Sequence, residues 1–526
     1  MQDFQDQFNT NGPTIMIDGD TFNFIIVGAG SAGCVVANRL SEVKMWKVLL
    51  IEAGGDPPIE SYVPQYDQRL FGTEFDWQYK TVPIGRTNSA NIGESIDWPR
   101  GKMLGGSSGI NSMIYFRGLA FDFDKWYELG NKEWRADIIF KYYKKLESFQ
   151  DNKLLRNSKI RDLYGLNGPQ VINTFNWTDE KVFENILNSY NQMGLQIQDD
   201  LQLANLLGAG LSRDTAYNGR RASTATTNWR EKTFGIKKYR LSLSTLDLPG
   251  VGKNLQDHII IHVPIFGSKP RAQNEIDKYL GVALYAYNRT GYLAQPSASH
   301  IIAFYSRNKK ATHPEFQVHL DLSDKNSSYA KSIFSIFKEP IYQSFSELTE
   351  KYDSFVFRFN LLRPYSRGNI YLNTSNPFDH PLIYANYLED ERDIEATVEG
   401  IRMLTGIVET DYFKSIDAFI GRYNWTKCNK YKHNTYDYWR CITPEIVNTI
   451  YHPVGTCAMG PDPSSAVVDS RLRVHHVKGL RVIDASIMPY ITSCNTNGPT
   501  IMIGERGSDL IKEDHGIVER IEDCSL

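Results

Sequence analysis

The sequence FIIVGAGSAGCVVANRL begins at Phe24, and WKVLLIEAGG follows it after a short gap and ends at Gly55. Apolar runs at 24–27 and 48–51 predict two buried strands, and the residues between them have helical spacing. Three glycines at GxGxxG spacing follow the first run, and Glu52 follows the second. This order of strand, glycine turn, helix, strand and acid predicts a dinucleotide-binding βαβ unit.

Each small residue of this unit has a physical role in the prediction. Gly28 permits the tight turn, Gly30 lets the backbone approach a pyrophosphate, and Gly33 lets the helix pack closely on the strand. The first helical turn, at Ser31 and Ala32, offers N–H groups and a partial positive charge to phosphate. Glu52 is predicted to accept hydrogen bonds from ribose hydroxyls. The motif alone does not separate FAD from NAD.

Length and composition bound the class of protein. The 526 residues are enough for several domains, and 41% hydrophobic with 23% charged residues is ordinary for a globular protein. A net charge of −3 gives no electrostatic case for binding nucleic acid. No apolar run approaches the roughly 18 residues of a membrane-spanning helix, and the first residues lack the pattern of a signal peptide.

The six cysteines include no CxxC pair, so we predict no zinc site or other metal site. Cys428 and Cys441 could pair in an oxidising compartment, which the sequence leaves open. Five N-x-S/T sequons favour an extracellular location only weakly, and the compartment stays undetermined at this stage.

Apolar runs at 259–265, 301–305 and 355–362 predict an antiparallel sheet in a second, β-rich domain. The pattern over 390–409 predicts an amphipathic helix, and 480–483 predicts a short strand.

The nine residues NTNGPTIMI occur twice, at 9–17 and at 495–503. The second copy contains Asn497 and begins a predicted helix near Pro499, because proline is favoured in a first turn. The first copy precedes the dinucleotide motif, and we predict that it belongs to a non-catalytic extension.

The segment WPRGKMLGGSSGINSMIYFRG, at 98–118, is rich in small residues whose backbone N–H groups can lie against a flat or charged ligand. It also contains GxSxG around Ser107. A hydrolase nucleophile elbow requires an apolar strand directly before it, and Arg100 and Lys102 argue against one. Near the end of the sequence, YHPVGT contains His452. From the residues alone, a core role for His452 and a helix-capping role for Asn497 compete with catalysis.

Taken together, these segments resemble the glucose–methanol–choline (GMC) family of FAD-dependent alcohol oxidoreductases. RGKMLGGSSGINSMIYFRGLAFDFD is similar to the first family signature, and LPGVGKNLQDH, HPVGT and NTNGPTIMIGE follow in family order. The resemblance runs from Phe22 to about Asp514, and the insect members similar to glucose dehydrogenase and ecdysteroid oxidase look nearest.

The resemblance implies FAD as the cofactor and a fold of two parts. One is an α/β FAD-binding domain with a Rossmann-like βαβ core, and the other is an α+β substrate domain with an antiparallel sheet. We expect an N-terminal extension at 1–21, the first part of the FAD domain at 22–262 and the substrate domain at 263–445. Residues 446–526 are expected to return to the FAD domain and to carry the active site.

The resemblance also implies roles for residues. His452 takes the position of the active-site histidine and would accept the hydroxyl proton while hydride passes to flavin N5. Asn497 takes the partner position that is His or Asn and would orient the hydroxyl. Beyond the six residues of the βαβ unit, the cofactor-binding residues that it implies are Ala53, Arg100, Met103, Gly105, Gly106, Asn111, Met113, Ile114, Asp484, Ala485 and Pro499. The implied partners are a small alcohol and an electron acceptor, either oxygen or a quinone-like molecule.

The sequence departs from the family pattern in one place. A second family signature, similar to GAxxSPxLLxxSGIG, is expected between Ala225 and Leu248. The residues found there are TTNWREKTFGIKKYRLSLSTLD, so the FAD domain is shortened near 226–247. Loss of this region is expected to expose a sheet edge and apolar surface. The alternative function is therefore a catalytically impaired isoform, or one that does not bind FAD.

Overall fold

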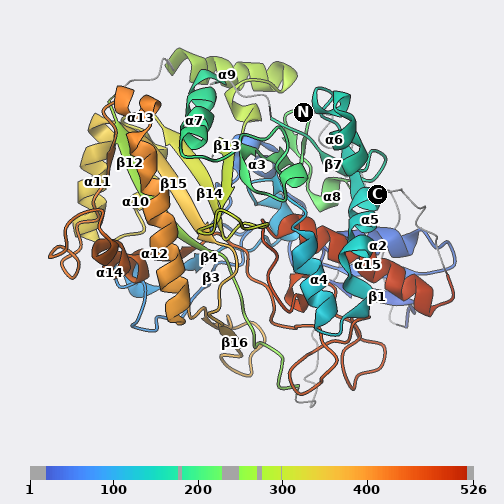
Figure 1. Cartoon of the computed structure of the whole chain (residues 1–526). Helices are drawn as coiled ribbons and strands as arrows, with labels where there is room; N and C mark the ends of the chain where they lie inside the picture. The colour runs from blue at the N-terminus through green and yellow to red at the C-terminus, as the bar shows by residue number, and fades with distance from the viewer. Residues whose placement is uncertain (1–18, 176–179, 228–247, 269–274, 298, 518–526) are drawn as a thin grey trace.

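The computed structural model describes residues 19–175, 180–227, 248–268, 275–297 and 299–517. Two halves lie side by side (Figure 1). One half holds a large antiparallel sheet with helices against it, and the other holds the βαβ unit with helices from both ends of the sequence. This arrangement agrees with the predicted two-part α/β and α+β fold.

The predicted βαβ unit is formed by β1 (Phe24–Val27), α2 (Gly33–Ser41) and β2 (Val48–Ile51). The two strands are parallel. Gly28 has φ +95°, the left-handed conformation that glycine adopts without strain. A Cβ on Gly33 would lie 1.9 Å from the Gly28 carbonyl oxygen, so only glycine allows this approach of helix to turn. The prediction for the local structure is thus confirmed.

The large sheet has seven strands, and its main path runs β18–β12–β15–β14–β13–β8 with antiparallel pairing throughout. It confirms the antiparallel sheet predicted from the apolar runs. The bounds of its strands are β8 (Gly208–Leu211), β12 (Ile259–Gly267), β13 (Ser299–Tyr305), β14 (Phe316–Ser323), β15 (Asp353–Leu361), β18 (Phe419–Ile420) and, paired to β12, β19 (Asn448–Thr449).

The two faces of this sheet differ in chemistry because side chains alternate along a strand. Phe359 on β15 faces α12 (Glu391–Thr405), where a Cβ on Gly400 would lie 2.5 Å from its ring. Arg358 faces the opposite way and lines a cavity. The helix predicted over 390–409 is α12, with a 3₁₀ turn at its end.

The other half is built around α15 (Asn497–Asp514), which packs against α2 and α5 (Ala136–Leu146). Buried ion pairs hold this half together. Arg117 pairs with Glu147, both nearly inaccessible, and Glu505 on α15 pairs with Arg39 on α2 at 2.8 Å. None of the described helices is both long and apolar enough to cross a membrane.

The other helices and short strands connect these parts. They are α3 (Ile59–Tyr62), β3 (Tyr79–Lys80), β4 (Asp97–Trp98), β5 (Ile114–Tyr115), α4 (Ala120–Glu128), β6 (Glu147–Phe149), α6 (Ser158–Leu163), β7 (Gln170–Ile172), α7 (Glu180–Gln192), β9 (Arg213–Asp214), β10 (Ala216–Tyr217), β11 (Arg220–Arg221), α8 (Thr224–Thr227), α9 (Glu275–Asn288), α10 (Ser328–Phe334), α11 (Glu339–Lys351), β16 (Asn369–Tyr371), β17 (Leu382–Tyr384), α13 (Asp411–Ser415) and α14 (Tyr436–Ile446).

One predicted strand is wrong. Residues 480–483 make only a single bridge, between Arg481 and Arg473, because no neighbouring strand in the described part of the chain offers them a ladder. Among the described residues β1 likewise pairs only with β2, and the side chains of Ile25 and Val27 are 60% and 69% exposed. Both side chains line a cavity of the protein, and the expected exposure of a sheet edge beside residues 228–247 stays a prediction. Three regions lie outside the described residues: the segment 228–247, the first copy of the repeat and the sequon at Asn176.

Cys428 and Cys441 form a disulfide, the pairing that the sequence left open.

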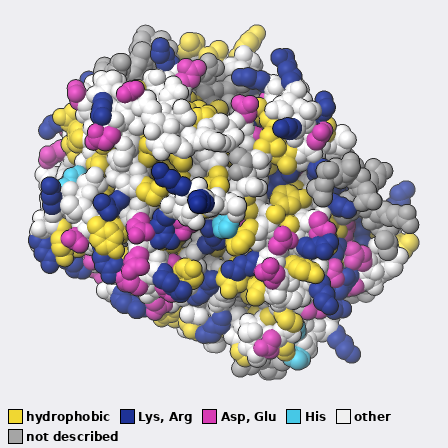
Figure 2. Space-filling view, viewed as in Figure 1, with side chains coloured by type: hydrophobic (Ala, Val, Ile, Leu, Met, Phe, Trp, Pro, Cys, Tyr) yellow, Lys and Arg dark blue, Asp and Glu magenta, His cyan; other side chains and the backbone are white. Residues whose placement is uncertain are grey.

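On the molecular face in Figure 2, basic and acidic side chains are interspersed.

Candidate active site

A cavity of about 2130 Å³ lies between the two halves. Its wall is formed by the turn after β1, the segments 99–114 and 473–486, and the face of the large sheet that bears Arg358. A pocket for one drug-sized ligand occupies roughly 300–1,000 Å³, so this cavity has room for a dinucleotide and a second molecule.

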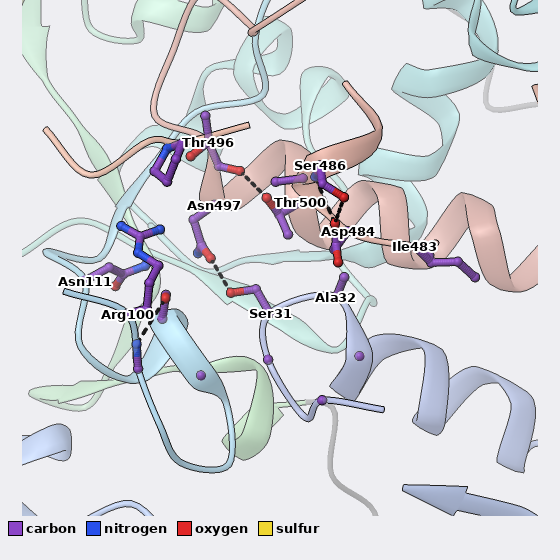
Figure 3. A pocket seen from close by; sticks show the side chains of 18 of the residues that line it. Ser31, Ala32, Arg100, Asn111, Ile483, Asp484, Ser486, Thr496, Asn497 and Thr500 are labelled. Atoms are coloured by element: carbon purple, nitrogen blue, oxygen red, sulfur yellow. Dashed lines mark hydrogen bonds between the residues drawn. The ribbon is translucent and has the colours of Figure 1, made fainter. Parts of the chain in front are cut away.

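Most predicted cofactor residues lie on the wall of this cavity, and Figure 3 shows several of them facing the same space. The predicted residues on the wall are Gly28, Gly30, Ser31, Ala32, Gly33, Glu52, Ala53, Arg100, Gly106, Asn111, Met113, Ile114, Asp484 and Ala485. Met103, Gly105 and Pro499 do not line it. Met103 and Pro499 are buried behind the wall, where they support the backbone that does.

The glycine turn leaves the space that a pyrophosphate needs. A Cβ built on Gly30 would meet no atom within 4 Å, so the open space beside it belongs to the cavity. A Cβ on Gly106 would lie 2.7 Å from Gly30 Cα, which brings the Gly/Ser-rich segment directly against the turn. The helix α2 begins at this wall with Gly33, while the N–H groups of Cys34 and Val36 already donate to the Gly30 and Ala32 carbonyls at 3.1 and 3.0 Å. The residues present thus fit a dinucleotide.

Two acidic residues at the site are already fixed by backbone groups. Glu52 accepts hydrogen bonds from the Ala29 N–H at 2.7 Å and from the Gly54 N–H at 2.8 Å. Asp484 accepts from the N–H and the hydroxyl of Ser486 at 2.8 and 2.6 Å, as Figure 3 shows. Each Glu52 oxygen keeps a second lone pair, and Asp484 accepts both bonds on Oδ1 and keeps its Oδ2, so both residues can still accept from a ligand hydroxyl.

His452 lies on the cavity wall, and it is 8% exposed. Its backbone N–H donates to Asp257 Oδ1 at 2.8 Å. Its Nδ1 lies 2.9 Å from His258 Nδ1, and its Nε2 lies 3.2 Å from Asn495 Nδ2. The side chains of His258 and Asn495 therefore each contact one of the two ring nitrogens of His452.

The directions of these hydrogen bonds follow from groups that can only accept or only donate. The Leu362 carbonyl, 3.0 Å from His258 Nε2, can only accept, so His258 carries its proton on Nε2. Burial lowers the pKa of His258 to about 4, so its Nδ1 is unprotonated and accepts from His452 Nδ1–H. His452 then has its lone pair on Nε2.

The amide of Asn495 agrees with this assignment. Gln317 Nε2 donates to Asn495 Oδ1 at 2.9 Å, which leaves Asn495 Nδ2 to face His452 Nε2 as a donor. Burial, together with the neighbouring His258, His319 and Arg100, holds the pKa of His452 well below its usual value. His452 is thus a neutral imidazole whose acceptor nitrogen faces the Asn495 amide, and both residues line the cavity.

Asn497, which the sequence assigned as the partner of His452, lies elsewhere. Its Oδ1 accepts from the Ser31 hydroxyl at 3.1 Å, beside the glycine turn (Figure 3). The residue against His452 is Asn495, two positions earlier in NTNGPTIMIGE. Sequence reasoning missed it because the motif contains two asparagines and α15 begins only at the second, so Asn495 remains in the loop that faces the histidine.

The GxSxG segment does not form a nucleophile elbow. Ser107 lies within a 3₁₀ turn (Gly106–Gly109) that follows a loop rather than a strand, and its hydroxyl accepts from the Gly101 N–H at 3.2 Å. Within the part of the chain that the structure describes, no histidine forms a hydrogen bond with this hydroxyl. The geometry therefore lacks the serine–base pair of a hydrolase.

A dinucleotide turn that lines a large cavity, with a buried neutral histidine on the same wall, is the arrangement of a dinucleotide-binding protein with a second site beside the cofactor. The family model described as GMC oxidoreductase matches this sequence twice, at residues 22–234 and 364–504. The chain belongs to the GMC oxidoreductase family.

Relatives over nearly the whole length agree with this. Ecdysone oxidase from Bombyx mori is 30% identical over 96% of this chain and 84% of its own length. Glucose dehydrogenase [FAD, quinone] from Drosophila pseudoobscura pseudoobscura is 31% identical over 94% and 87%. A formate oxidase from Aspergillus oryzae RIB40 has the same fold, with a TM-score of 0.79 at 23% identity over 95% of this chain and 100% of that one.

These comparisons confirm the predicted family, fold class, enzyme class and FAD as cofactor. Both parts of the family model are present, so the comparisons do not support the alternative of an impaired isoform.

Proposed function

We propose that this protein oxidises an alcohol, with His452 Nε2 as the acceptor of the hydroxyl proton. One observation carries the proposal: hydrogen bonds fix His452 as a neutral imidazole whose lone pair on Nε2 faces the Asn495 amide, with both residues on the cavity wall. A neutral base is required because a protonated imidazole could not take the proton.

When bound, FAD supplies the hydride acceptor, flavin N5. The chain itself binds and orients. The glycine turn and the start of α2 hold the pyrophosphate, and Glu52 and Asp484 accept from cofactor hydroxyls. The substrate hydroxyl donates to His452 Nε2 and accepts from Asn495 Nδ2. The present distance of 3.2 Å between these two nitrogens is at the long end of hydrogen bonds, so a hydroxyl can displace this contact.

Asn495 is therefore the residue that we propose to stabilise the developing alkoxide, a role that the family resemblance implied for Asn497. Asn497, bonded to Ser31 of the glycine turn, is proposed to help hold the cofactor. The two asparagines form a matched pair for a test, because they are identical in chemistry and two residues apart.

The test begins with the visible spectrum of the purified protein, followed by anaerobic addition of alcohols. We expect flavin absorbance that bleaches with alcohol. His452→Gln and Asn495→Ala should keep the absorbance and slow bleaching by on the order of 10²-fold or more. Asn497→Ala should weaken FAD binding and spare the rate in FAD-saturated protein.

The control variant is His380→Gln, at an exposed histidine outside the cavity. A colourless protein that stays colourless with added FAD would overturn the proposal. Bleaching that survives His452→Gln would overturn the role of His452.

We further propose that the electrons pass to oxygen or to a quinone-like acceptor, because the names of two relatives include an oxidase and a quinone-dependent dehydrogenase. Comparing oxygen consumption with dye reduction during turnover distinguishes oxygen from a quinone-like acceptor.

An extracellular location is proposed from the Cys428–Cys441 disulfide, since disulfides persist in oxidising compartments. Secretion of the expressed full chain tests it.

A further inference from the structure

A series of hydrogen bonds runs through the candidate active site, from the Leu362 carbonyl to the side chain of Gln317. His258 Nε2 lies 3.0 Å from the Leu362 carbonyl oxygen, and His258 Nδ1 lies 2.9 Å from His452 Nδ1. His452 Nε2 lies 3.2 Å from Asn495 Nδ2, and Asn495 Oδ1 lies 2.9 Å from Gln317 Nε2. We call His258, His452, Asn495 and Gln317 the hydrogen-bonded series. Gln317, on β14, ends it on the side away from the carbonyl.

The Leu362 carbonyl fixes the direction of every hydrogen bond in the series. It can only accept, so His258 donates from Nε2 and keeps an acceptor at Nδ1. A neutral imidazole has one N–H group, so His452 donates from Nδ1 and keeps an acceptor at Nε2. Asn495 then turns its N–H groups toward His452 and its oxygen toward Gln317. Gln317 therefore has to donate, because a carbonyl oxygen in its place would face the oxygen of Asn495.

The side chain of Gln317 has this one hydrogen bond in the part of the protein that the structure describes. Gln317 is fully buried, and its Oε1 has no hydrogen-bond partner. Because an unsatisfied buried oxygen is costly, an apolar side chain of similar length would serve the stability of the sheet at least as well. The contact with Asn495 is thus the feature that accounts for an amide at this position.

The orientation of Asn495 decides how well His452 can act as a base. With its N–H groups toward His452, Asn495 can donate to the substrate oxygen on which negative charge develops. With the amide turned over, its oxygen would face that charge and would favour a proton on His452 Nε2. The two ends of an amide have nearly the same shape, so the shape of the site alone does not choose between these orientations. The hydrogen bond from Gln317 does choose.

We propose that Gln317 is a positioning residue for the oxidation: its amide holds the oxygen of Asn495, so that the Asn495 N–H groups face His452 and the substrate hydroxyl. Gln317 does not line the cavity, and it acts through Asn495, which does. The inference rests on the proposed alcohol oxidation at His452 and adds a residue to it.

The first test compares Gln317→Met with the wild-type holoenzyme. Methionine keeps the length of the side chain and removes the amide, so Asn495 loses its fixed orientation. With the best substrate among n-butanol, benzyl alcohol and cyclohexanol, we expect anaerobic bleaching of the flavin to slow by about 10-fold. Tm should stay the same or rise, because the unpaired buried oxygen is removed as well.

Asn360→Leu is the matched control. Asn360 is the cross-strand partner of Gln317 on β15, is equally buried, and also has an unpartnered amide oxygen. Its Nδ2 donates to the backbone carbonyls of Gln317 and Arg358 and not to the hydrogen-bonded series. Asn360→Leu should therefore leave the bleaching rate within about twofold.

A double-mutant cycle separates positioning from general support of the fold. If Gln317 acts through Asn495, then Gln317→Met should have no further effect on the rate in the Asn495→Ala background. A residue that only supports the fold would slow the reaction by the same factor in both backgrounds.

Gln317→Glu tests the direction of the hydrogen bond. An ionised carboxylate can only accept, so it would draw the N–H groups of Asn495 away from His452, whereas a protonated carboxyl can donate as glutamine does. Burial raises the pKa of a carboxyl group, which brings this titration into the range of an assay. We expect the rate of Gln317→Glu relative to wild type to rise as the pH falls, by about 10-fold or more over the titration.

The ratio to wild type is used because other groups near the series also titrate. They are Asp257 and Arg100 beside His452, and Glu315, His319 and Arg358 on the face of the sheet that bears Gln317. Burial raises the pKa of Asp257 to about 6, for example. These groups are present in both proteins, so the ratio at each pH reports residue 317.

Gln317→Met that bleaches as fast as wild type would overturn the proposal. Equal slowing by Gln317→Met in the wild-type and Asn495→Ala backgrounds would also overturn it, as would a ratio for Gln317→Glu that is the same at every pH. Failure of the proposed function is distinguishable, because then none of the alcohols bleaches the flavin of the wild-type protein.

Discussion

The large sheet and the two-stranded β1–β2 sheet differ in how they are protected. In the large sheet, β12 is buried along its whole length, and strands flank it on both sides. We call the half that holds the βαβ unit the FAD half. In its described part, β1 has one neighbour, β2, and two of the four side chains of β1 are more than half exposed. The difference shows that an apolar strand, predicted to be buried from its sequence, is buried only where neighbouring strands or helices cover it.

The FAD half compensates by other means. Its helices α2 and α5 both pack on α15, and ion pairs join them to it, such as Arg39–Glu505 and Lys145–Asp509. The large sheet is stabilised chiefly by apolar packing, as in the contact of Phe359 with Phe316 at 5.1 Å between ring centroids. We therefore expect the two halves to respond differently to substitution.

The largest contrast is expected between equivalent truncations in the two sheets. Phe359→Ala should lower the free energy of unfolding by about 3–5 kcal/mol, because the ring is fully buried. Val27→Ala should cost less than about 0.5 kcal/mol, because its side chain is mostly exposed. Urea denaturation of both variants measures this, and a cost for Val27→Ala close to that of Phe359→Ala would contradict the comparison.

The second contrast concerns ion pairs within the FAD half and outside it. Glu147 accepts from Arg117, from the Tyr115 hydroxyl and from the Gly165 N–H. Glu147→Gln should cost about 3–5 kcal/mol because it leaves the Arg117 charge buried and uncompensated. The matched control is Asp97→Asn at the exposed Lys80 pair, where a loss below about 1 kcal/mol is expected. Thermal unfolding of the two variants measures both losses of stability, and equal losses for Glu147→Gln and Asp97→Asn would contradict this contrast.

Two glycines of the same turn separate folding from cofactor binding. Gly33→Ala should destabilise the protein by about 1–3 kcal/mol, because its Cβ would strike the Gly28 carbonyl. Gly30→Ala should leave the stability of the FAD-free protein unchanged and weaken FAD binding, because its Cβ points into open cavity. Titration with FAD and Tm without FAD measure the two effects; loss of Tm in Gly30→Ala would show that this space is filled by the protein.

The smallest effect on stability is expected at the exposed face of β1. Ile25→Thr with Val27→Thr keeps β-branched side chains and removes apolar surface, so the free energy of unfolding should change by less than about 0.5 kcal/mol. Aggregation on heating should decrease, because exposed apolar edge strands promote association. Light scattering tests this, and a double variant that unfolds at a lower temperature would indicate that β1 is covered in solution.

The sequence predicted the elements whose pattern is local. Gly28 and Gly33 have the conformation and contacts that the βαβ motif requires, and α12 follows the apolar period over 390–409. The predicted strand at 480–483 failed because strand formation depends on a partner, which the local pattern does not contain.

The candidate site divides in the same way. The sequence by itself determined the dinucleotide turn, the family, and His452 as the histidine to examine, because these depend on residue types at fixed spacing. Only the tertiary structure decided that Asn495 rather than Asn497 contacts His452, and that His258 fixes its tautomer. It alone also brought Gln317 against Asn495, since folding joins residues that lie 178 positions apart in the sequence.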